Sequence, residues 1–517
     1  MKTGQQQRIY RFSQAPIWEL QRKYFEEQGI QAWQSGEVPQ YITSNPTMAQ
    51  AYAEIIFGFL RDRAVMGLTA DPVYILELGA GSGRFAYHLM KALCRLLDDS
   101  GIKAARFCYI MSDLPAKNVA YWQQHRYLQP FVQAGLLDFA QFDAEHASAL
   151  QLTESGLSIH PGDLQQPLLI VANYFFDSIP QELLYVNENQ IYECGISLQY
   201  PEEAADLSTG ELLESLNPEY HYRRAEEYEA NSYVYKDLIE LYRLHLDDSH
   251  FLFPAVGLSC LERLGRLSSQ GLMLISADKG DHRLEYWEDR EAPKLIRHGS
   301  FSLTANYHAL QYIYERKGAK TLFTLHHYNH LNIGCILMLD DPEGYKDTRL
   351  AYRRFVENFG PDDFFSLKNM LDLHMDSMEL VQLLAVWRLS GYDAQLFIQS
   401  FNRILAMLPT STEAEMQDIA RAIDFMWEGY YPIEEKHDLA FDCGLLLYEM
   451  DMLEEALVFF EHSLSAYDAH VAVYYNTAIC HYQLGSDEQA EAFALQSLSL
   501  EPEHEGALAL IKLLKAP

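Results

Sequence analysis

The feature that most constrains how this chain can fold is a glycine-rich string that follows an apolar run. Residues 73–78 read as a buried strand, residues 79–83 have glycine at every second position, and the pattern of residues 85–97 predicts a helix. Because glycine has no Cβ, a ligand can approach the backbone of such a strand-to-helix turn closely. The first turn of the following helix adds unpaired N–H groups. The string therefore predicts a ligand-binding turn in an α/β domain.

The spacing of the glycines indicates which ligand the turn binds. A dinucleotide site has the pattern GxGxxG, which would place its third glycine at position 84. That position is Arg84, and the third glycine comes one residue earlier. The GxGxG form with an acidic residue two places before its first glycine is typical of S-adenosylmethionine (SAM) sites. We therefore predict SAM as the cofactor, with Gly79, Gly81 and Gly83 around its aminoacyl part and Glu77 receiving its ammonium group.

Further apolar runs predict a parallel sheet around this turn. The predicted strands are residues 107–111, 137–142, 168–172 and 271–276, followed by 321–325 and 333–339. Helical patterns separate the first of these, and alternation of strands and helices builds a doubly wound parallel sheet. A short polar turn joins the last two, which predicts an antiparallel hairpin at the sheet edge. The expected fold is the α/β class I methyltransferase fold, which is Rossmann-like with seven strands and a terminal antiparallel hairpin.

Polar residues at the predicted strand ends are the remaining site candidates. Asp113 ends the second strand and is placed to accept from the ribose hydroxyls, although a helix N-cap is the alternative role. Asp143 follows the third strand and could take the adenine amino group. Asn173 and Asp177 follow the fourth strand, whose end faces the transferred methyl group in this fold. We predict that Asn173 and Asp177 are catalytic, since orientation of the reactants supplies much of the acceleration in methyl transfer.

The chain is long enough for more than one domain. We expect an N-terminal helical cap (residues 1–70), a methyltransferase domain (71–342) with an insertion at about 187–265, and a helical domain (345–517). The insertion opens with a pattern that predicts a hairpin at 182–186 and 190–196, and it continues in a Tyr-rich stretch, 220–246, that we expect to be helical. Insertions at this place overhang the carboxyl ends of the strands, where ligands bind.

The helical domain carries an internal repeat near its end. Gly444, Ala456 and Leu464 recur 34 residues later as Ala478, Ala490 and Leu498. This period is typical of tetratricopeptide repeats, which stack and leave a groove for a peptide or protein. We expect the repeats to recruit a protein partner. The alternatives are that they cover apolar surface or make a dimer, and the oligomeric state stays open.

Composition excludes some classes of partner. The formal net charge is −34, from 39 basic and 73 acidic residues. Binding to nucleic acids and to anionic membranes depends on basic side chains, so neither is expected. The charge favours a basic protein partner, or it serves only to keep the protein in solution.

Cysteine and histidine usage predicts neither disulfides nor a metal site. The seven cysteines are scattered without a CxxC pair, which is typical of a reducing compartment. His326, His327 and His330 share one turn without a spaced carboxylate partner, so we expect surface residues and no metal. No apolar run reaches the length of a membrane span, and the N-terminus lacks the apolar region of a signal peptide. The expected location is cytoplasmic.

Taken together, four segments of the chain resemble the MidA-like methyltransferase family, to which the mitochondrial complex I assembly arginine methyltransferase belongs. These segments are residues 41–56, the glycine string 77–83, Asn173–Pro180 (NYFFDSIP, against NxFFDxxP in the family) and 302–308. The resemblance covers residues 35–340 and implies a SAM-dependent fold and dimethylation of a protein arginine. Three positions depart from the family pattern: Tyr174 replaces an acidic residue, and residues 306–308 replace a His-Val-Asp string. The acidic position of the second strand does not align with the family either, and Asp113 is the nearest candidate for it. SAM binding therefore carries over better than the arginine specificity.

Three functions fit these observations. The first is a SAM-dependent methyltransferase that acts on a protein recruited by the repeats. The second is a small-molecule methyltransferase whose repeats mediate oligomerisation. The third is a scaffold without catalytic activity, in which a degenerate domain holds SAM or nothing. The glycines and Asp177 speak against full degeneration, whereas the departures at Tyr174 and at residues 306–308 keep this alternative open.

Overall fold

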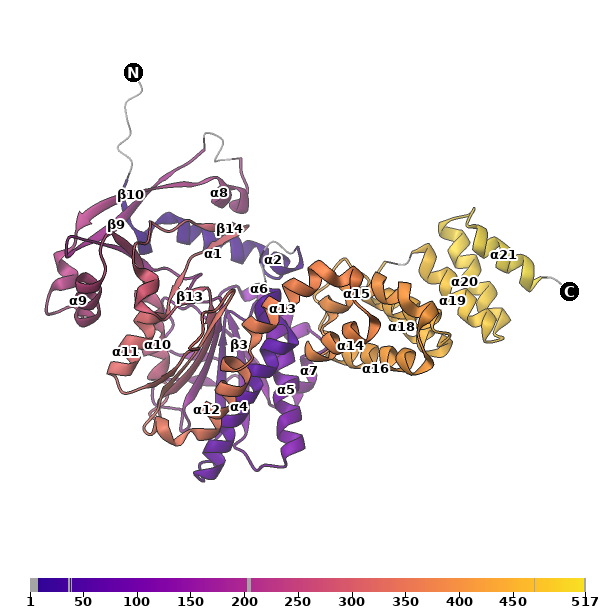
Figure 1. Cartoon of the computed structure of the whole chain (residues 1–517), viewed down its shortest axis with the longest axis horizontal. Coiled ribbons are helices and arrows are strands. Elements are labelled where there is room, and N and C mark those ends of the chain that lie inside the picture. Colours follow the sequence, from indigo (N-terminus) through magenta and orange to yellow (C-terminus); the bar gives the residue numbers. More distant parts are fainter. Residues whose placement is uncertain (1–7, 36–37, 39, 202–205, 469, 516–517) are drawn as a thin grey trace, which may run out of the picture. The chain divides into compact units, whose positions relative to one another are not determined.

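The structure is a computed structural model that describes residues 8–35, 38, 40–201, 206–468 and 470–515 (Figure 1). Parts of the predicted N-terminal cap (1–7, 36–37 and 39), insertion (202–205) and helical domain (469 and 516–517) lie outside the described residues. The chain divides into two compact units, Met1–Leu367 and Lys368–Pro517.

A seven-stranded mixed sheet is the centre of the first unit. Its order is β17 (Lys320–Leu322), β18 (Asn332–Met338), β12 (Leu272–Asp278), β7 (Leu168–Asn173), β2 (Val73–Leu78), β3 (Phe107–Asp113) and β4 (Leu137–Gln141). The five strands from β12 to β4 are parallel, whereas β18 is antiparallel to both of its neighbours. The predicted strands and the hairpin at the edge are thus confirmed. The first unit has a methyltransferase-like fold.

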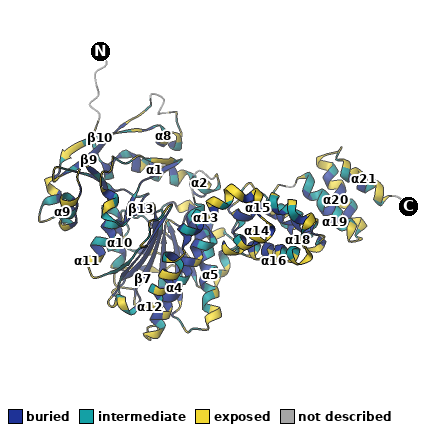
Figure 2. Cartoon of the chain, viewed as in Figure 1, coloured by how far each residue is buried: buried dark blue, intermediate teal, exposed yellow. Residues whose placement is uncertain are grey.

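Helices bury the apolar strands of this sheet, which are dark blue in Figure 2. Runs such as Leu168–Asn173 are apolar on both faces because a parallel sheet is covered on both sides. The accompanying helices are α4 (Pro46–Val65), α5 (Arg84–Ser100), α6 (Ala116–Gln124), α7 (Gln129–Gln133), α10 (Ala255–Gly265) and α11 (Tyr307–Arg316). Local sequence fixes where α4 begins, since Asn45 accepts the backbone N–H of Met48 and proline occupies the first helical position.

The strand order reverses direction beside β2, and this reversal positions the site. From β2 the chain continues through β3 and β4 on one side, and it then crosses to β7 and β12 on the other side. Ligands of open α/β sheets bind at the carboxyl ends of the strands at such a switch point. The ends of β2 and β7 are direct neighbours, with Leu78 opposite Ala172.

A second, antiparallel sheet occupies most of the predicted insertion. Its strands are β1 (Tyr10–Arg11), β8 (Glu182–Asn187), β9 (Gln190–Gln199), β10 (Asn217–Arg224) and β11 (Ser249–Phe253), with α8 (Thr209–Ser215) and α9 (Lys236–His245) between them. The predicted hairpin is confirmed as β8 and β9. The expected helix over residues 220–246 is wrong in its first part, because Tyr220 and Tyr222 belong to a strand paired with β9 along its whole length. The tyrosines there follow the two-residue period of a strand, and the stretch is helical only at a 3-10 turn (Glu226–Glu229) and in α9.

Short elements complete the first unit. They are α1 (Pro16–Gln28), α2 (Gln31–Gln34), α3 (Tyr41–Ser44), β5 (Leu150–Gln151), β6 (Ser158–Ile159), β13 (Gly280–Asp281), β14 (Ile296–His298), β15 (Ser300–Ser302) and β16 (Ala305–Asn306). Of these, α1, α2, α3, β14 and β15 contribute side chains to the site described below.

The helix α12 (Lys346–Tyr352) belongs to the first unit, because α4 holds its N-terminus. The buried carboxylate of Asp62 accepts the backbone N–H groups of Asp347 and Thr348 and the hydroxyl of Thr348, at 2.7–3.0 Å. Gly58 allows this approach, since a Cβ there would lie 2.8 Å from the Asp347 carbonyl oxygen. The all-helical pattern after residue 342 therefore starts before the division at Leu367, and the expected boundary at 345 falls inside the first unit.

The second unit is a series of helices. They are α14 (Leu380–Leu389), α15 (Ala394–Met407), α16 (Glu413–Gly429), α17 (Leu439–Glu449), α18 (Leu453–Ala466), α19 (Val471–Gln483), α20 (Asp487–Leu500) and α21 (Glu505–Leu514), and α13 (Pro361–His374) runs across the division. None of the described helices of the chain combines the length and the apolar character that a membrane crossing requires.

The repeated small residues lie where paired helices touch. Helices α17 and α18 pack together, and so do α19 and α20. Ala456, Ala478 and Ala490 are fully buried, and a Cβ on Gly444 would lie only 2.7 Å from the ring of Phe460. The 34-residue spacing therefore marks two consecutive helical hairpins with the same small residues at their contacts.

Candidate functional site

The glycine turn after β2 has backbone conformations that favour glycine. Gly79, Gly81 and Gly83 have φ values of +71°, +56° and +82°. A Cβ on Gly79 would meet no atom within 4 Å, whereas one on Gly81 would lie 3.0 Å from the ring of Trp33. Gly83 is the N-cap of α5. The turn thus leaves an open backbone face at Gly79 and a tightly covered one at Gly81.

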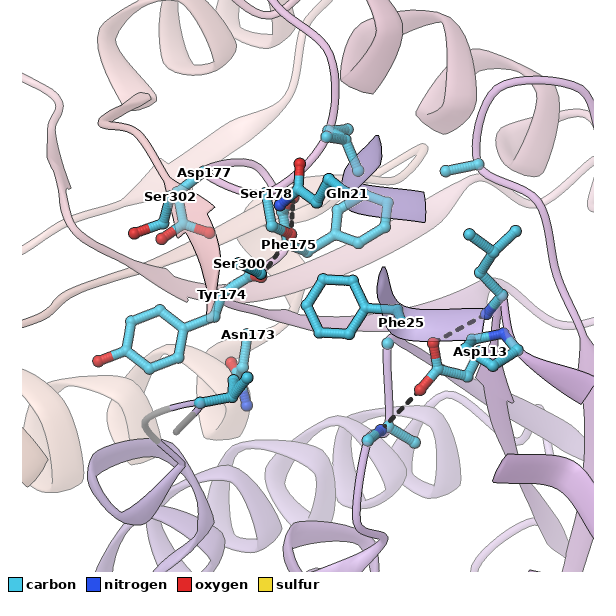
Figure 3. Close-up of a pocket in the computed structure, with 18 of the residues that line it drawn as sticks. Gln21, Phe25, Asp113, Asn173, Tyr174, Phe175, Asp177, Ser178, Ser300 and Ser302 are labelled. Carbon is cyan, nitrogen blue, oxygen red and sulfur yellow. Dashed lines mark hydrogen bonds between the residues drawn. The ribbon is translucent and has the colours of Figure 1, made fainter. Parts of the chain in front are cut away.

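The carboxylate of Asp113, at the end of β3, fixes this turn in place. It accepts the backbone N–H of Gly81 at 3.0 Å and the backbone N–H of Leu114 at 2.8 Å (Figure 3). It also accepts the side-chain amide of Asn118 at 2.9 Å. The alternative role as an N-cap is not observed, because the N-cap of α6 is Pro115. Asp113 lines the cavity and also supports the glycine turn.

Glu77 carries an unsatisfied carboxyl group beneath the turn. The residue is 4% exposed, and its Oε2 atom is buried with no hydrogen-bond partner among the described residues. Burial raises the pKa of Glu77 to about 8. The neighbouring Tyr109 hydroxyl favours the ionised form of the group, but a buried oxygen without a donor still costs free energy, which a cationic donor at this place would recover.

A cavity of about 240 Å³ joins the ends of β2, β3, β4 and β7. Seven of the eight site residues expected from sequence line it, and Gly83 does not. The seven are Glu77, Gly79, Gly81, Asp113, Asp143, Asn173 and Asp177. The structure therefore brings candidates from four separate strand ends together, as the topology of the sheet requires.

The turn after β7 is held in an unusual conformation. Tyr174 has φ +50°, which is rare for an aromatic residue and marks local strain. The hydroxyl of Ser178 donates to the Tyr174 carbonyl oxygen at 2.8 Å and supports this turn. Asn173 accepts the Tyr52 hydroxyl at 2.7 Å through Oδ1, and its Nδ2 is buried without a partner among the described residues. The amide of Asn173 thus retains a free donor.

Asp177 lies at the far end of the same turn. It is 2% exposed, and its Oδ1 takes no donor from the described residues. Asp278, the last residue of β12, lies behind it and accepts the backbone N–H of Phe176 at 3.1 Å. The sequence analysis missed Asp278, although it is the first acidic residue after the fifth apolar run.

The N-terminal helices supply a wall of the cavity that the sequence did not predict. Trp18, Gln21 and Phe25 of α1 and Trp33 of α2 line it, and Figure 3 shows Phe25 between Asp113 and the turn after β7. No glycine string or strand end marks these residues, so only their apolar helical pattern could have indicated a buried face.

Arg22 of α1 pairs with Asp143, the residue predicted to bind adenine. It donates to the Asp143 carboxylate at 2.9 and 3.3 Å and to Glu145 at 3.0 Å. Burial opposes ionisation of Asp143, but the hydrogen bonds from Arg22 outweigh it and lower the pKa of Asp143 to about 2. Asp143 lines the cavity as an ionised group already paired with α1.

The part of the cavity beyond Asp177 is lined by polar side chains. Gln21 donates through Nε2 to the Phe301 carbonyl oxygen at 2.8 Å and leaves its buried Oε1 without a donor among the described residues. The Ser300 hydroxyl and the His298 Nδ1 are likewise buried and unpartnered within that part of the chain. Lys279 also lines the cavity.

Comparison with known proteins identifies the family. Residues 63–332, just over half of the chain, match a family model described as "Putative S-adenosyl-L-methionine-dependent methyltransferase". The chain belongs to this family. This methyltransferase family uses SAM, so SAM is the cofactor. Two features of the site fit SAM: the unsatisfied carboxyl oxygen of Glu77 and the open backbone face at Gly79.

Solved structures that match the chain are more distant. An uncharacterised protein from Burkholderia thailandensis is 15% identical, with a TM-score of 0.38 over 61% of this chain and 73% of that chain. Another from the same organism and superfamily, bound to S-adenosylhomocysteine, is 16% identical, with a TM-score of 0.39 over 61% and 74%. Magnesium protoporphyrin IX methyltransferase from Synechocystis with bound SAM is 11% identical, with a TM-score of 0.28 over 62% and 96%. No curated protein sequence matches the chain.

Proposed function

We propose that this chain is an active class I methyltransferase of the MidA-like type that methylates a side chain of a protein. One observation carries the proposal: a single cavity joins the glycine turn after β2 to the polar turn after β7. A cofactor site and an acceptor site must share one cavity, because the methyl group passes directly from one to the other. The resemblance of Asn173–Pro180 to the family motif favours arginine as the acceptor.

The residues at β2, β3 and β4 would hold the cofactor. Glu77 is placed to receive the ammonium group, and the open backbone at Gly79 accommodates the aminoacyl part. Asp113 and Asp143 lie on the cavity wall, where they would face the ribose and the adenine. When bound, SAM supplies an electrophilic methyl group on a positively charged sulfur.

The residues at the end of β7 would orient the acceptor. The free donor on Asn173 and the free acceptor oxygen on Asp177 lie on one turn. The Tyr52 hydrogen bond and the Ser178 hydroxyl fix this turn, so both groups are positioned before the acceptor binds. Such preorganisation is the main contribution that a protein can make to a direct displacement.

We propose further that the helical unit consists of tetratricopeptide-like repeats that recruit the protein substrate. Residues 368–517 contain 25 acidic and 7 basic residues, a net charge of −18 out of −34 for the whole chain. A surface of this charge attracts basic proteins and repels nucleic acids. A basic protein of the cytoplasm, presenting arginine, is the expected partner.

The test is transfer of a labelled methyl group. The purified full-length chain is incubated with methyl-labelled SAM and a lysate of its source cells, and the products are separated by gel and by filtration. A labelled protein band supports the proposal, and amino-acid analysis of that band identifies the methylated residue. The Asp177→Asn variant is the matched control, since it retains the cofactor wall.

Two other results would contradict the proposal in different ways. A labelled small molecule in the filtrate would indicate a small-molecule methyltransferase, with the repeats serving another purpose such as oligomerisation. Absence of any labelled product, together with measurable SAM binding, would indicate a scaffold without catalytic activity.

A further inference from the structure

A pair of buried carboxyl groups lies at the acceptor end of the cavity. Asp177 is 2% exposed and Asp278 is fully buried, and their side chains are within hydrogen-bonding reach of each other. Asp177 lines the cavity, whereas Asp278 lies behind it at the end of β12. The Oδ1 atoms of both residues have no donor among the described residues.

Two carboxyl groups can form a hydrogen bond only if one of them carries a proton. With both ionised, neither oxygen is a donor and two negative charges lie side by side without water. The backbone N–H of Phe176 occupies Oδ2 of Asp278, whereas its buried Oδ1 takes no donor from the described residues. Burial of two neighbouring carboxyl groups without a donor between them therefore favours at least one proton on the pair.

We propose that Asp177 and Asp278 act as one proton-accepting unit for the acceptor, with Asp278 as the positioning residue. The inference rests on the proposed methyltransferase function. The acceptor heteroatom forms a bond to the methyl carbon, the carbon–sulfur bond breaks with its electron pair on sulfur, and the acceptor releases one proton. Asp177 takes that proton as the pair passes from one shared proton to two, and the proton later leaves to water.

The surroundings raise the pKa values of both carboxyl groups and so favour uptake of a proton by the pair. Burial raises the pKa of both carboxyl groups, and for Asp278 the neighbouring Asp177 raises it further. A base is most effective when its pKa lies near the working pH. Other titratable and charged groups face the pair from α4, the turn after β7, the segment after β12 and the start of α11. They are Tyr52, Tyr174, Lys279 and Tyr307.

The acceptor class follows from this chemistry. A thioether or a tertiary amine loses no proton when it is methylated and has no use for such a pair. A nitrogen or oxygen that carries a hydrogen must release it, so the pair fits an N–H or O–H acceptor. A protein side chain with an N–H group is the form of this class that the proposed function favours.

The first test measures the shared proton without any substrate. Because the folded pair binds protons more tightly than the unfolded chain, its contribution to stability is present at low pH and is lost as the pH rises through the folded pKa values. Thermal unfolding of the wild type and of Asp278→Asn is followed at pH 5 and pH 8. The difference in melting temperature between the wild type and the variant should decrease by about 2 °C or more from pH 5 to pH 8. An equal pH dependence in both proteins would overturn the shared proton.

The second test uses label transfer from SAM to lysate protein over the same pH range. Asp278→Asn replaces a charge by a neutral hydrogen-bond donor, so the pH at half-maximal rate should fall by about one unit or more. Asp177→Asn should reduce the rate by about 100-fold or more. The matched control is Asp138→Asn, a buried aspartate of β4 outside the site, which should keep the wild-type midpoint.

The outcomes separate the two proposals. A lower rate of Asp278→Asn at every pH with an unchanged midpoint means a purely structural role and overturns the inference. Absence of transfer by the wild type at any pH refutes the proposed function and with it the catalytic use of the pair. The unfolding comparison still decides, in that case, whether the proton is shared.

Discussion

Binding of the cofactor should depend on pH through Glu77. The carboxyl group is buried with a pKa of about 8, so near neutral pH it is mostly protonated in the empty site. A protonated carboxyl group cannot pair with the ammonium group of the cofactor. Binding must therefore remove a proton from Glu77, and the affinity should rise as the pH rises.

The size of the effect follows from the fraction of Glu77 that is ionised. Apparent affinity scales with the binding-competent fraction, which rises about 25-fold between pH 6 and pH 7.5 for a group with a pKa of about 8. This change corresponds to about 2 kcal/mol of binding free energy. An α-amino group stays protonated up to about pH 7.5, so the ligand contributes little to the change over this range.

Isothermal titration calorimetry with S-adenosylhomocysteine and with SAM measures both the affinity and the proton. In buffers of different ionisation enthalpy the wild type should release close to one proton per ligand at pH 6. Glu77→Gln should bind more weakly at pH 7.5 and show no pH dependence. His298→Gln is the control for a second titratable group on the cavity wall and should keep the wild-type slope. A wild-type affinity that is constant from pH 6 to pH 7.5 would refute the reasoning.

Other changes test the rest of the site and fold. Gly81→Arg should abolish SAM binding in calorimetry, because its Cβ would already lie 3.0 Å from Trp33 and the left-handed φ is unfavourable for arginine. Asp177→Asn should keep SAM affinity within a few-fold but lose label transfer, and a collapse of its melting temperature would instead show a structural role. Asp62→Ala should lower the unfolding free energy in urea by about 3 kcal/mol, since three donors lose their acceptor. Truncation after Leu367 should leave SAM binding intact and remove capture of the protein partner from lysate, and an insoluble fragment would contradict the division into two units.

Sequence reasoning found the parts of the fold that local patterns determine. The apolar runs and the glycine string could be read directly, because buried strands and a left-handed turn each require particular residue types. Topology then places the strand ends beside one another, which is why Asn173 and Glu77 could be assigned to one site. The first part of residues 220–246 was misread as helix, because its alternating tyrosines lie in a charged segment and their partner strand is distant in sequence.

The remaining features depend on contacts between distant segments. Nothing near Asp143 in the sequence indicates that Arg22 pairs with it. Asp278 ends a strand like several other residues, and only the packing of β12 beside β7 brings it to Asp177. The division of the chain at Leu367 depends on contacts of the same kind, since α12 has an ordinary helical pattern and nothing near it in the sequence indicates its attachment to Asp62.

That attachment has a consequence for how the protein is made. The Asp62 carboxylate lies 285 residues before the first backbone N–H that it accepts, at Asp347. During synthesis the sheet can assemble strand by strand, but α4 stays uncovered on one side until the ribosome has released α12. Contacts of such long sequence separation form slowly, and a surface that waits for them is exposed to aggregation. Docking of α12 therefore acts as a late step in the folding of the first unit, well after the residues that bind the cofactor have been produced.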